Sequence, residues 1–198
     1  MINKISELIL QKYLLGASIN QEDKELYQYG ITLMFTHIFF FAFALICGAI
    51  LSCLIESLIF YTEFQLIRIF AGGYHASSER KCEIMSSLLI LACILLIRLA
   101  STVKFDKIVL TIAIISAICI FILCPLDTPE KPLSNKEFRC FRKLSRLILL
   151  ILIAIIIISY VLKWKIALVP SCMSVILESL LLVAGKVKKV YQIKNAKQ

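Results

Sequence analysis

The chain has 198 residues, of which 60% are hydrophobic, and a formal net charge of +9. This composition excludes an ordinary soluble globular domain, because apolar stretches of nearly 20 residues recur along the chain as they do in membrane helices. The basic residues lie in short segments that flank these stretches. They therefore indicate orientation in a membrane rather than nucleic-acid binding, and we expect no nucleic-acid partner.

Residues 1–29 carry apolar side chains at roughly helical spacing with polar residues between them. The pattern favours an amphipathic helix that lies in the membrane interface and breaks at Gly16, with a packing helix that does not touch the membrane as an equal alternative. Asn20 is expected to cap a second, short polar helix. No cleavable signal peptide is expected, because the first long apolar run starts only near Ile31.

Long apolar runs fill residues 31–184 and predict a bundle of about six transmembrane helices. The predicted spans are residues 31–52, 54–70, 84–100, 108–124, 147–162 and 166–184. A basic tail follows over residues 185–198. We therefore expect an all-α, polytopic membrane protein that forms one membrane domain over residues 1–198.

The distribution of basic residues between the predicted loops gives an orientation. With six spans, 17 of the 22 Lys and Arg residues fall on the side of both termini and five on the other side. Loops rich in Lys and Arg stay in the cytoplasm. We expect a multi-pass protein of the cell membrane with its N- and C-termini in the cytoplasm.

The second predicted span is unusually polar, because Glu56, Glu63, Gln65 and Arg68 lie inside it. Intramembrane charges are costly and normally face a protein interior or a wet cavity. One interpretation is a transporter or exporter whose polar pathway uses Glu56, Glu63 and Arg68. Six short spans without an internal repeat disfavour a secondary transporter, so transport is the second choice.

Residues 125–146 form the longest polar loop, which begins with three prolines and continues with basic residues. A basic loop of this kind sets membrane topology. Its second half is also compatible with a basic interfacial helix that binds a peptide.

The polar residues between the second and third spans include His75 and, seven residues later, Cys82. A thiol and an imidazole in one short segment are the components of cysteine nucleophilic catalysis. On one straight helix they would stand ~10.5 Å apart, too far for proton transfer. We therefore expect Gly72 and Gly73 to allow a sharp turn and the helix to begin after His75.

Ser77 or Ser78 is the expected N-cap of the third span, which places Cys82 near the first turn. A helix N-terminus and the neighbouring cations Arg80 and Lys81 favour the thiolate, whereas nearby acidic residues oppose it. The other cysteines lie mostly in apolar spans, and the eight contain no CxxC pair. We expect neither a disulfide framework nor a metal site, and no cofactor.

The segment Ala-Gly-Gly-Tyr-His-Ala-Ser-Ser at residues 71–78, with Cys82 four residues later, resembles the core of the AgrB family, accessory gene regulator protein B. Residues 125–132, Pro-Leu-Asp-Thr-Pro-Glu-Lys-Pro, resemble the proline-rich loop that follows the fourth span in that family. The chain length, six spans and polar N-terminal segment agree, so the resemblance covers nearly the whole chain.

The resemblance implies a membrane cysteine endopeptidase of quorum sensing that removes the acidic C-terminal tail of an AgrD-type propeptide and promotes its cyclisation. Cys82 would be the nucleophile and His75 the general base and acid. Ser77, Glu63 and Asp127 are candidates to orient His75. Basic residues that could hold the acidic tail are Arg80, Lys81, Lys131, Lys136 and Arg139. Besides the propeptide and the lipid bilayer, a second copy of the chain is a candidate partner, because short bundles with charged inner faces often pair, although the sequence does not fix the oligomeric state.

Overall fold

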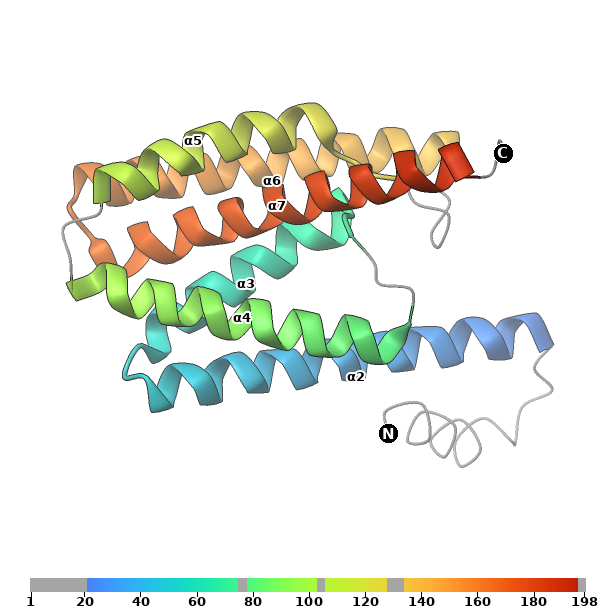
Figure 1. The fold of residues 1–198 in the computed structure, drawn as a ribbon, viewed down its shortest axis with the longest axis horizontal. Helices are drawn as coiled ribbons and strands as arrows, with labels where there is room; N and C mark the ends of the chain where they lie inside the picture. Colours follow the sequence, from blue (N-terminus) through green and yellow to red (C-terminus); the bar gives the residue numbers. More distant parts are fainter. Residues whose placement is uncertain (1–20, 75–77, 103–105, 128–133, 196–198) are drawn as a thin grey trace. The chain divides into compact units, whose positions relative to one another are not determined.

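A computed structural model describes residues 21–74, 78–102, 106–127 and 134–195 (Figure 1). Over these residues the fold is all-α, as predicted, and the only extended pairing is an isolated parallel bridge between Gly72 and Leu126. The helices are α2 (Gln21–Ile50), α3 (Leu54–Ala71), α4 (Glu79–Thr102), α5 (Asp106–Leu123), α6 (Asn135–Val161) and α7 (Lys165–Asn195). The interfacial helix predicted before Gly16 lies outside the described residues.

Four helices are long and apolar enough to cross a membrane, judged by length and composition over the described residues. These stretches are Gly30–Ile50, Arg80–Ala100, Asn135–Val161 and Lys165–Gln192. The apolar stretch of α5, Lys107–Leu123, is shorter, and α3 carries the charged residues noted above. Each of the six helices overlaps one of the six predicted spans, and the chain is a membrane protein.

Two helices are longer than the sequence predicted. The expected polar helix after Asn20 and the first span form one continuous helix, α2, which passes through Gly30 without a break. Likewise, α6 begins at Asn135, twelve residues before the predicted fifth span. The reason is a capping box, in which Ser134 Oγ accepts a hydrogen bond from Glu137 N–H and the Glu137 carboxylate accepts one from Ser134 N–H. The basic second half of the predicted loop is therefore helix.

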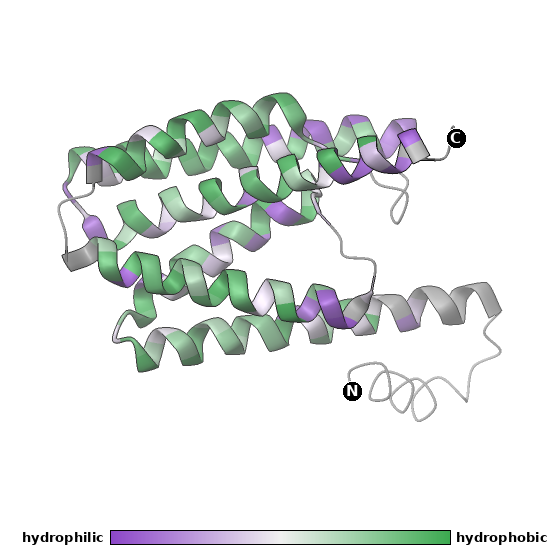
Figure 2. Ribbon diagram, in the orientation of Figure 1, coloured by the Kyte–Doolittle hydropathy of each residue, from purple (hydrophilic) through white to green (hydrophobic). Residues whose placement is uncertain are grey.

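The chain divides into two compact units, residues 1–43 and 44–198. In the second unit α7 packs against α3, α4, α5 and α6 and forms the centre of the core (Figure 1). Side chains of α3, α5, α6 and α7, among them Ile67, Ile120, Leu152 and Cys172, make up this core. Figure 2 shows hydrophobic residues along the middle of α5 and α6, and hydrophilic residues at the start of α6 and the end of α7.

Candidate active site

The start of α4 places Cys82 where the sequence predicted it, near the first turn of a helix. Ser78 precedes the helix, and its Oγ accepts a hydrogen bond from the backbone N–H of Lys81 at 3.4 Å. The backbone N–H of Cys82 is bonded to Ser78 O at 3.0 Å. Ser78 is therefore the N-cap. His75 and Ser77 lie outside the described residues.

Cys82 is half-buried, which distinguishes it from most of the other seven thiols. Cys47, Cys53, Cys93, Cys124 and Cys172 are buried, and Cys140 is exposed on α6. The cations Arg80 and Lys81 are exposed beside Cys82. The thiol is thus partly accessible, at a helix N-terminus and beside positive charge, and these are the surroundings that favour a reactive thiolate.

The glycine segment that leads to His75 is held by Arg68 from the last turn of α3. The Arg68 guanidinium donates to the carbonyl oxygens of Gly72 at 2.6 Å and Tyr74 at 2.7 Å. Gly72 and Gly73 have φ angles of 77° and 134°, which side-chain-bearing residues rarely adopt. A Cβ on Gly73 would also collide with the Arg68 guanidinium. Both glycines are therefore required by the turn, as the sequence predicted.

A carboxylate that the sequence analysis did not single out, Glu178 on α7, holds Arg68 in turn. Glu178 Oε2 lies 3.8 Å from an Arg68 guanidinium nitrogen, and the two side chains are 0% and 17% exposed. Neither Glu178 oxygen has a hydrogen-bond partner among the described residues. The signal that could have found Glu178 is the presence of a single acid within the last apolar span, where ionisable residues are functional candidates.

The C-terminal half of α7 also binds the segments after α3 and α5 through its backbone and lysines. Tyr74 N–H donates to Leu181 O at 2.9 Å. Gly185 lets the chain approach closely, since a Cβ there would stand 2.9 Å from Tyr74 N. Lys188 Nζ lies 5.6 Å from the centre of the Tyr74 ring. The residue that immediately precedes His75 is therefore fixed on α7.

Asp127, a candidate to orient His75, belongs to the same group of contacts. Lys189 Nζ donates to the Asp127 backbone oxygen at 2.9 Å and lies 3.6 Å from its carboxylate. Leu126 N–H donates to Ala71 O at 2.8 Å, beside the bridge to Gly72. The start of the proline-rich loop and the glycine segment are thus brought together, although 50 residues separate them in the sequence.

Glu63, another candidate to orient His75, lies elsewhere. It is buried, and its two carboxylate oxygens accept hydrogen bonds from Ser171 Oγ at 2.9 Å and Ser174 Oγ at 3.2 Å. Glu63 lies nine positions before Gly72, which is about 13 Å along the helix axis. Glu63 therefore joins α3 to α7 and does not reach the glycine segment.

The predicted tail-binding cations are divided between two helix starts. Arg80 and Lys81 are exposed in the first turn of α4, and Lys136 and Arg139 are exposed in the first two turns of α6. Lys131 lies outside the described residues. No group of three or more potential metal ligands was found over the described part of the chain.

The model of the family described as "AgrB: Accessory gene regulator B" matches residues 2–182 of the chain. The chain belongs to the AgrB family. Two AgrB-like proteins of Clostridium perfringens, from strain 13 (type A) and strain SM101 (type A), are each 28% identical to it over 171 residues, which cover 83% of this chain and 80% of the relative. No solved structure matches it significantly. Membership indicates a part in the processing of agr quorum-sensing peptides at a membrane.

Proposed function

We propose that this AgrB family member is a membrane cysteine endopeptidase that cleaves the C-terminal tail from an AgrD-type propeptide and closes the remaining peptide into a ring. The observation that carries the proposal is the half-buried thiol of Cys82 near the capped start of α4, on the segment that follows the anchored Tyr74 and includes His75. The buried position of five of the other seven cysteines supports Cys82 as the nucleophile.

In this mechanism His75 takes the proton of the Cys82 thiol, and the thiolate attacks the carbonyl carbon of the scissile peptide bond. The C–S bond forms, the C–N bond breaks, and His75 gives the proton to the departing amine of the tail. A thiol or hydroxyl of the bound peptide then attacks the thioester and closes a thiolactone or lactone. The proton that it loses passes through His75 back to Cys82, so the enzyme is unchanged.

Arg68 and Glu178 are positioning residues in this proposal, because Arg68 holds the carbonyl oxygens of Gly72 and Tyr74, shortly before His75, and Glu178 lies against the Arg68 guanidinium. Asp127 lies beside the same segment, so it is preferred to Glu63 as the residue that orients His75. The acidic tail would be held by the exposed cations at the starts of α4 and α6, through charge complementarity.

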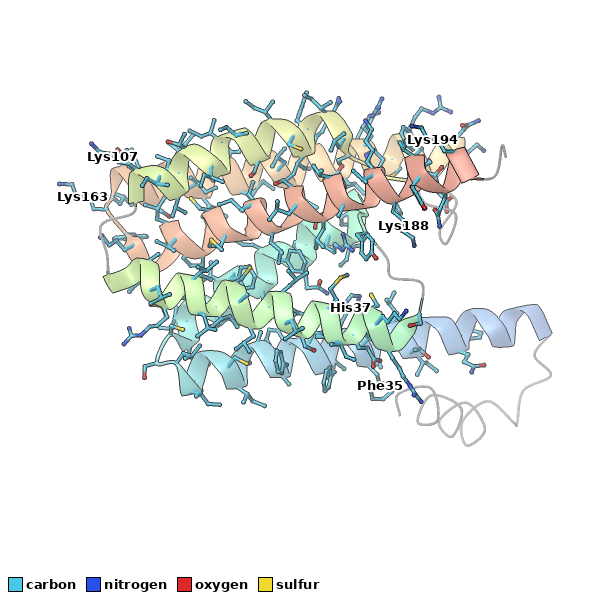
Figure 3. All side chains as sticks on the ribbon, viewed as in Figure 1. Phe35, His37, Lys107, Lys163, Lys188 and Lys194 are labelled. Atoms are coloured by element: carbon cyan, nitrogen blue, oxygen red, sulfur yellow. The ribbon has the colours of Figure 1, made fainter. Side chains whose placement is uncertain are left out.

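The proposal includes a multi-pass topology with both termini in the cytoplasm, one membrane domain and a homodimer. The topology is supported by the lysines of residues 44–198. Lys107 and Lys163 lie at one end of this unit, and Lys188 and Lys194 lie at the other end (Figure 3). Labelling of cysteines introduced at these positions from either side of the membrane tests the orientation.

The test is co-expression of a tagged AgrD-type precursor with the full-length protein, read by gel mobility and by mass spectrometry of the released peptide. We expect Cys82→Ala and His75→Ala each to abolish cleavage, and the double variant to be no worse than either single variant, because the pair acts as a unit. Cys140→Ala, which removes an exposed thiol outside the site, should cleave normally. Cleavage by Cys82→Ala would disprove the mechanism.

Thiol modification separates activation from simple exposure. Cys140 is exposed and Cys82 is half-buried, so accessibility alone predicts that a limiting amount of iodoacetamide modifies Cys140 first. An activated thiolate at Cys82 predicts the opposite order. Transport without proteolysis would instead leave Cys82→Ala active and make Glu63→Gln inactive.

A further inference from the structure

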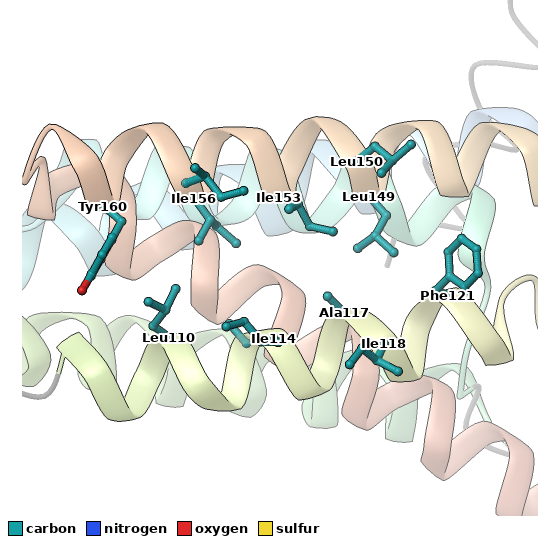
Figure 4. Close-up of a pocket in the computed structure, with 12 residues that line it drawn as sticks. Leu110, Ile114, Ala117, Ile118, Phe121, Leu149, Leu150, Ile153, Ile156 and Tyr160 are labelled. Atoms are coloured by element: carbon teal, nitrogen blue, oxygen red, sulfur yellow. The ribbon is translucent and has the colours of Figure 1, made fainter.

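A groove between α5 and α6 is not used by the proposed peptidase chemistry. It has a volume of about 420 Å³ and is lined by six residues of each helix (Figure 4). Apart from the hydroxyl of Tyr160, the lining side chains are hydrocarbon. Both helices belong to the unit of residues 44–198.

The groove has a buried floor and exposed edges. Ala113 and Leu149, on its floor, are each 2% exposed, whereas Ile114, Leu150 and Ile157 on its edges are 56% to 59% exposed. The small side chains of α5 at its floor leave room that larger residues would fill. The groove is thus open to the surroundings along its length, where the bilayer supplies acyl chains.

Its length matches one leaflet. Leu110 and Phe121 line its two ends on α5, eleven residues apart, which corresponds to about 16 Å along a helix. Half of the ~30 Å hydrocarbon core of a bilayer is about 15 Å. A single acyl chain aligned with α5 would therefore run from the groove's end at Phe121 towards the middle of the membrane.

The end of the groove at Phe121 carries positive charge. The guanidinium carbon of Arg146 lies 4.2 Å from the centre of the Phe121 ring, and its Nε is buried without a hydrogen-bond partner among the described residues. Arg142, one turn earlier on α6, lies over the ring of Phe138 at 5.1 Å. Neither arginine has a carboxylate partner in the described part of the chain.

We infer that this groove binds one anionic phospholipid, with an acyl chain between α5 and α6 and its phosphate on Arg146 and Arg142. The charge complementarity of a phosphate with two guanidinium groups that lack a carboxylate partner among the described residues selects this occupant over a zwitterionic lipid. Basic pockets between membrane helices on the cytoplasmic side are typical sites for anionic headgroups. The inference does not depend on cleavage of a propeptide.

The test uses the full-length protein reconstituted in vesicles of phosphatidylcholine mixed with phosphatidylglycerol, extracted in mild detergent and examined by native mass spectrometry. We expect bound phosphatidylglycerol to be enriched over its share of the bilayer. Each cation near an anionic lipid contributes a preference of roughly fivefold, so two arginines give roughly twenty-five-fold. Equal retention of both lipids would overturn the inference.

Matched variants test the two halves of the site. Arg142→Gln/Arg146→Gln should remove the preference for phosphatidylglycerol. Lys143→Gln, which removes an exposed charge from the same helix, should retain it. An equal loss of preference in both variants would mean that the net positive charge of the helix attracts the lipid, and it would overturn the site. Ala117→Leu should fill the groove and lower lipid retention, whereas Ala154→Leu adds the same side chain to an exposed part of α6 and should not.

Folding and the alternative occupant are checked separately. Arg146→Lys keeps the charge and should retain most of the preference if the variant proteins fold. Ile118→Cys, at the groove edge, should not form cross-links between two copies of the chain; efficient cross-linking would show that a second copy covers the groove and would overturn the lipid assignment.

Discussion

The two sides of the bundle formed by residues 44–198 differ in the kind of contact that joins their helices. Between α3 and α7, buried polar groups pair individually: Glu63 with two serines, and Arg68 with Glu178. Between α5 and α6 the contact is hydrocarbon apart from the Tyr160 hydroxyl and the Arg146 guanidinium over the Phe121 ring, and it leaves an open groove. Because acyl chains compete for apolar surface but not for buried polar partners, the α3–α7 side fixes one register and the α5–α6 side accommodates lipid.

The largest effect is expected from breaking the buried charge pair. Glu178→Leu leaves the Arg68 charge without its carboxylate and should destabilise the protein by roughly 3–5 kcal/mol. Arg68→Met/Glu178→Leu should recover much of the thermal midpoint in detergent but not the cleavage, since the carbonyl oxygens of Gly72 and Tyr74 lose their donor. A double variant as unstable as Glu178→Leu alone would show that the pair is not coupled.

Gly73→Ala should come next. The new Cβ meets the Arg68 guanidinium at a φ of 134°, so we expect a loss of more than about 1 kcal/mol and a strong loss of precursor cleavage. Gly30→Ala is the matched control, because nothing lies within 4 Å of its added Cβ in α2. If both variants cleave like the wild type, the glycine segment does not need the observed turn.

A smaller effect is expected where hydroxyls bind Glu63. Ser171→Ala and Ser174→Ala should each lower stability by about 0.6 kcal/mol, the average for hydrogen bonds between membrane helices. Ser179→Ala should be neutral, because among the described residues the Ser179 hydroxyl donates to Ile176 O of its own helix and to no other helix. Chemical unfolding in mixed micelles measures all three, and a Ser179→Ala loss equal to the others would remove the distinction.

The smallest effect belongs to the edge of the groove. Ile157 is 56% exposed, so Ile157→Ala should change stability by no more than about 0.5 kcal/mol in a lipid environment. A loss above about 1 kcal/mol, measured in the same assay, would mean that protein rather than lipid covers this face.

The sequence predicted the six helices because long apolar runs are a local property. Capping is local too, so the sequence narrowed the N-cap of α4 to Ser77 or Ser78, and the structure identifies Ser78. The pairing of Arg68 with Glu178 could not be predicted, because no local pattern says which residues of two spans 110 positions apart will face each other. The early start of α6 was predictable, since Ser134 and Glu137 have capping-box spacing. The basic residues alone left two interpretations for the second half of this loop, a topology-setting loop or a basic helix, and the structure shows helix.

The candidate site shows the same division. The position of Cys82 near a helix start and the glycine turn were predictable from spacing and residue type, whereas the role of Cys82 stays a proposal. Glu63 and Asp127 are both candidates to orient His75 from the sequence, and only the fold separates them: Glu63, near His75 in sequence, bonds the serines of α7, whereas Asp127, far from it in sequence, lies beside the glycine segment. Distance along the sequence therefore predicted neither case: the acid near His75 in sequence lies away from the glycine segment, and the acid far from it in sequence lies beside that segment.

The continuity of α6 has a consequence for how the chain can change over evolutionary time. Arg142 and Arg146 share one rigid helix with the groove residues Leu149 and Ile153, so their angular phase is fixed. One inserted residue between the two groups would rotate the charges by about 100° and carry them off the groove without removing any of them. Between Arg146 and Leu149, therefore, only insertions and deletions whose lengths restore the helical phase keep the charges beside the groove, even where the residue types are free to vary.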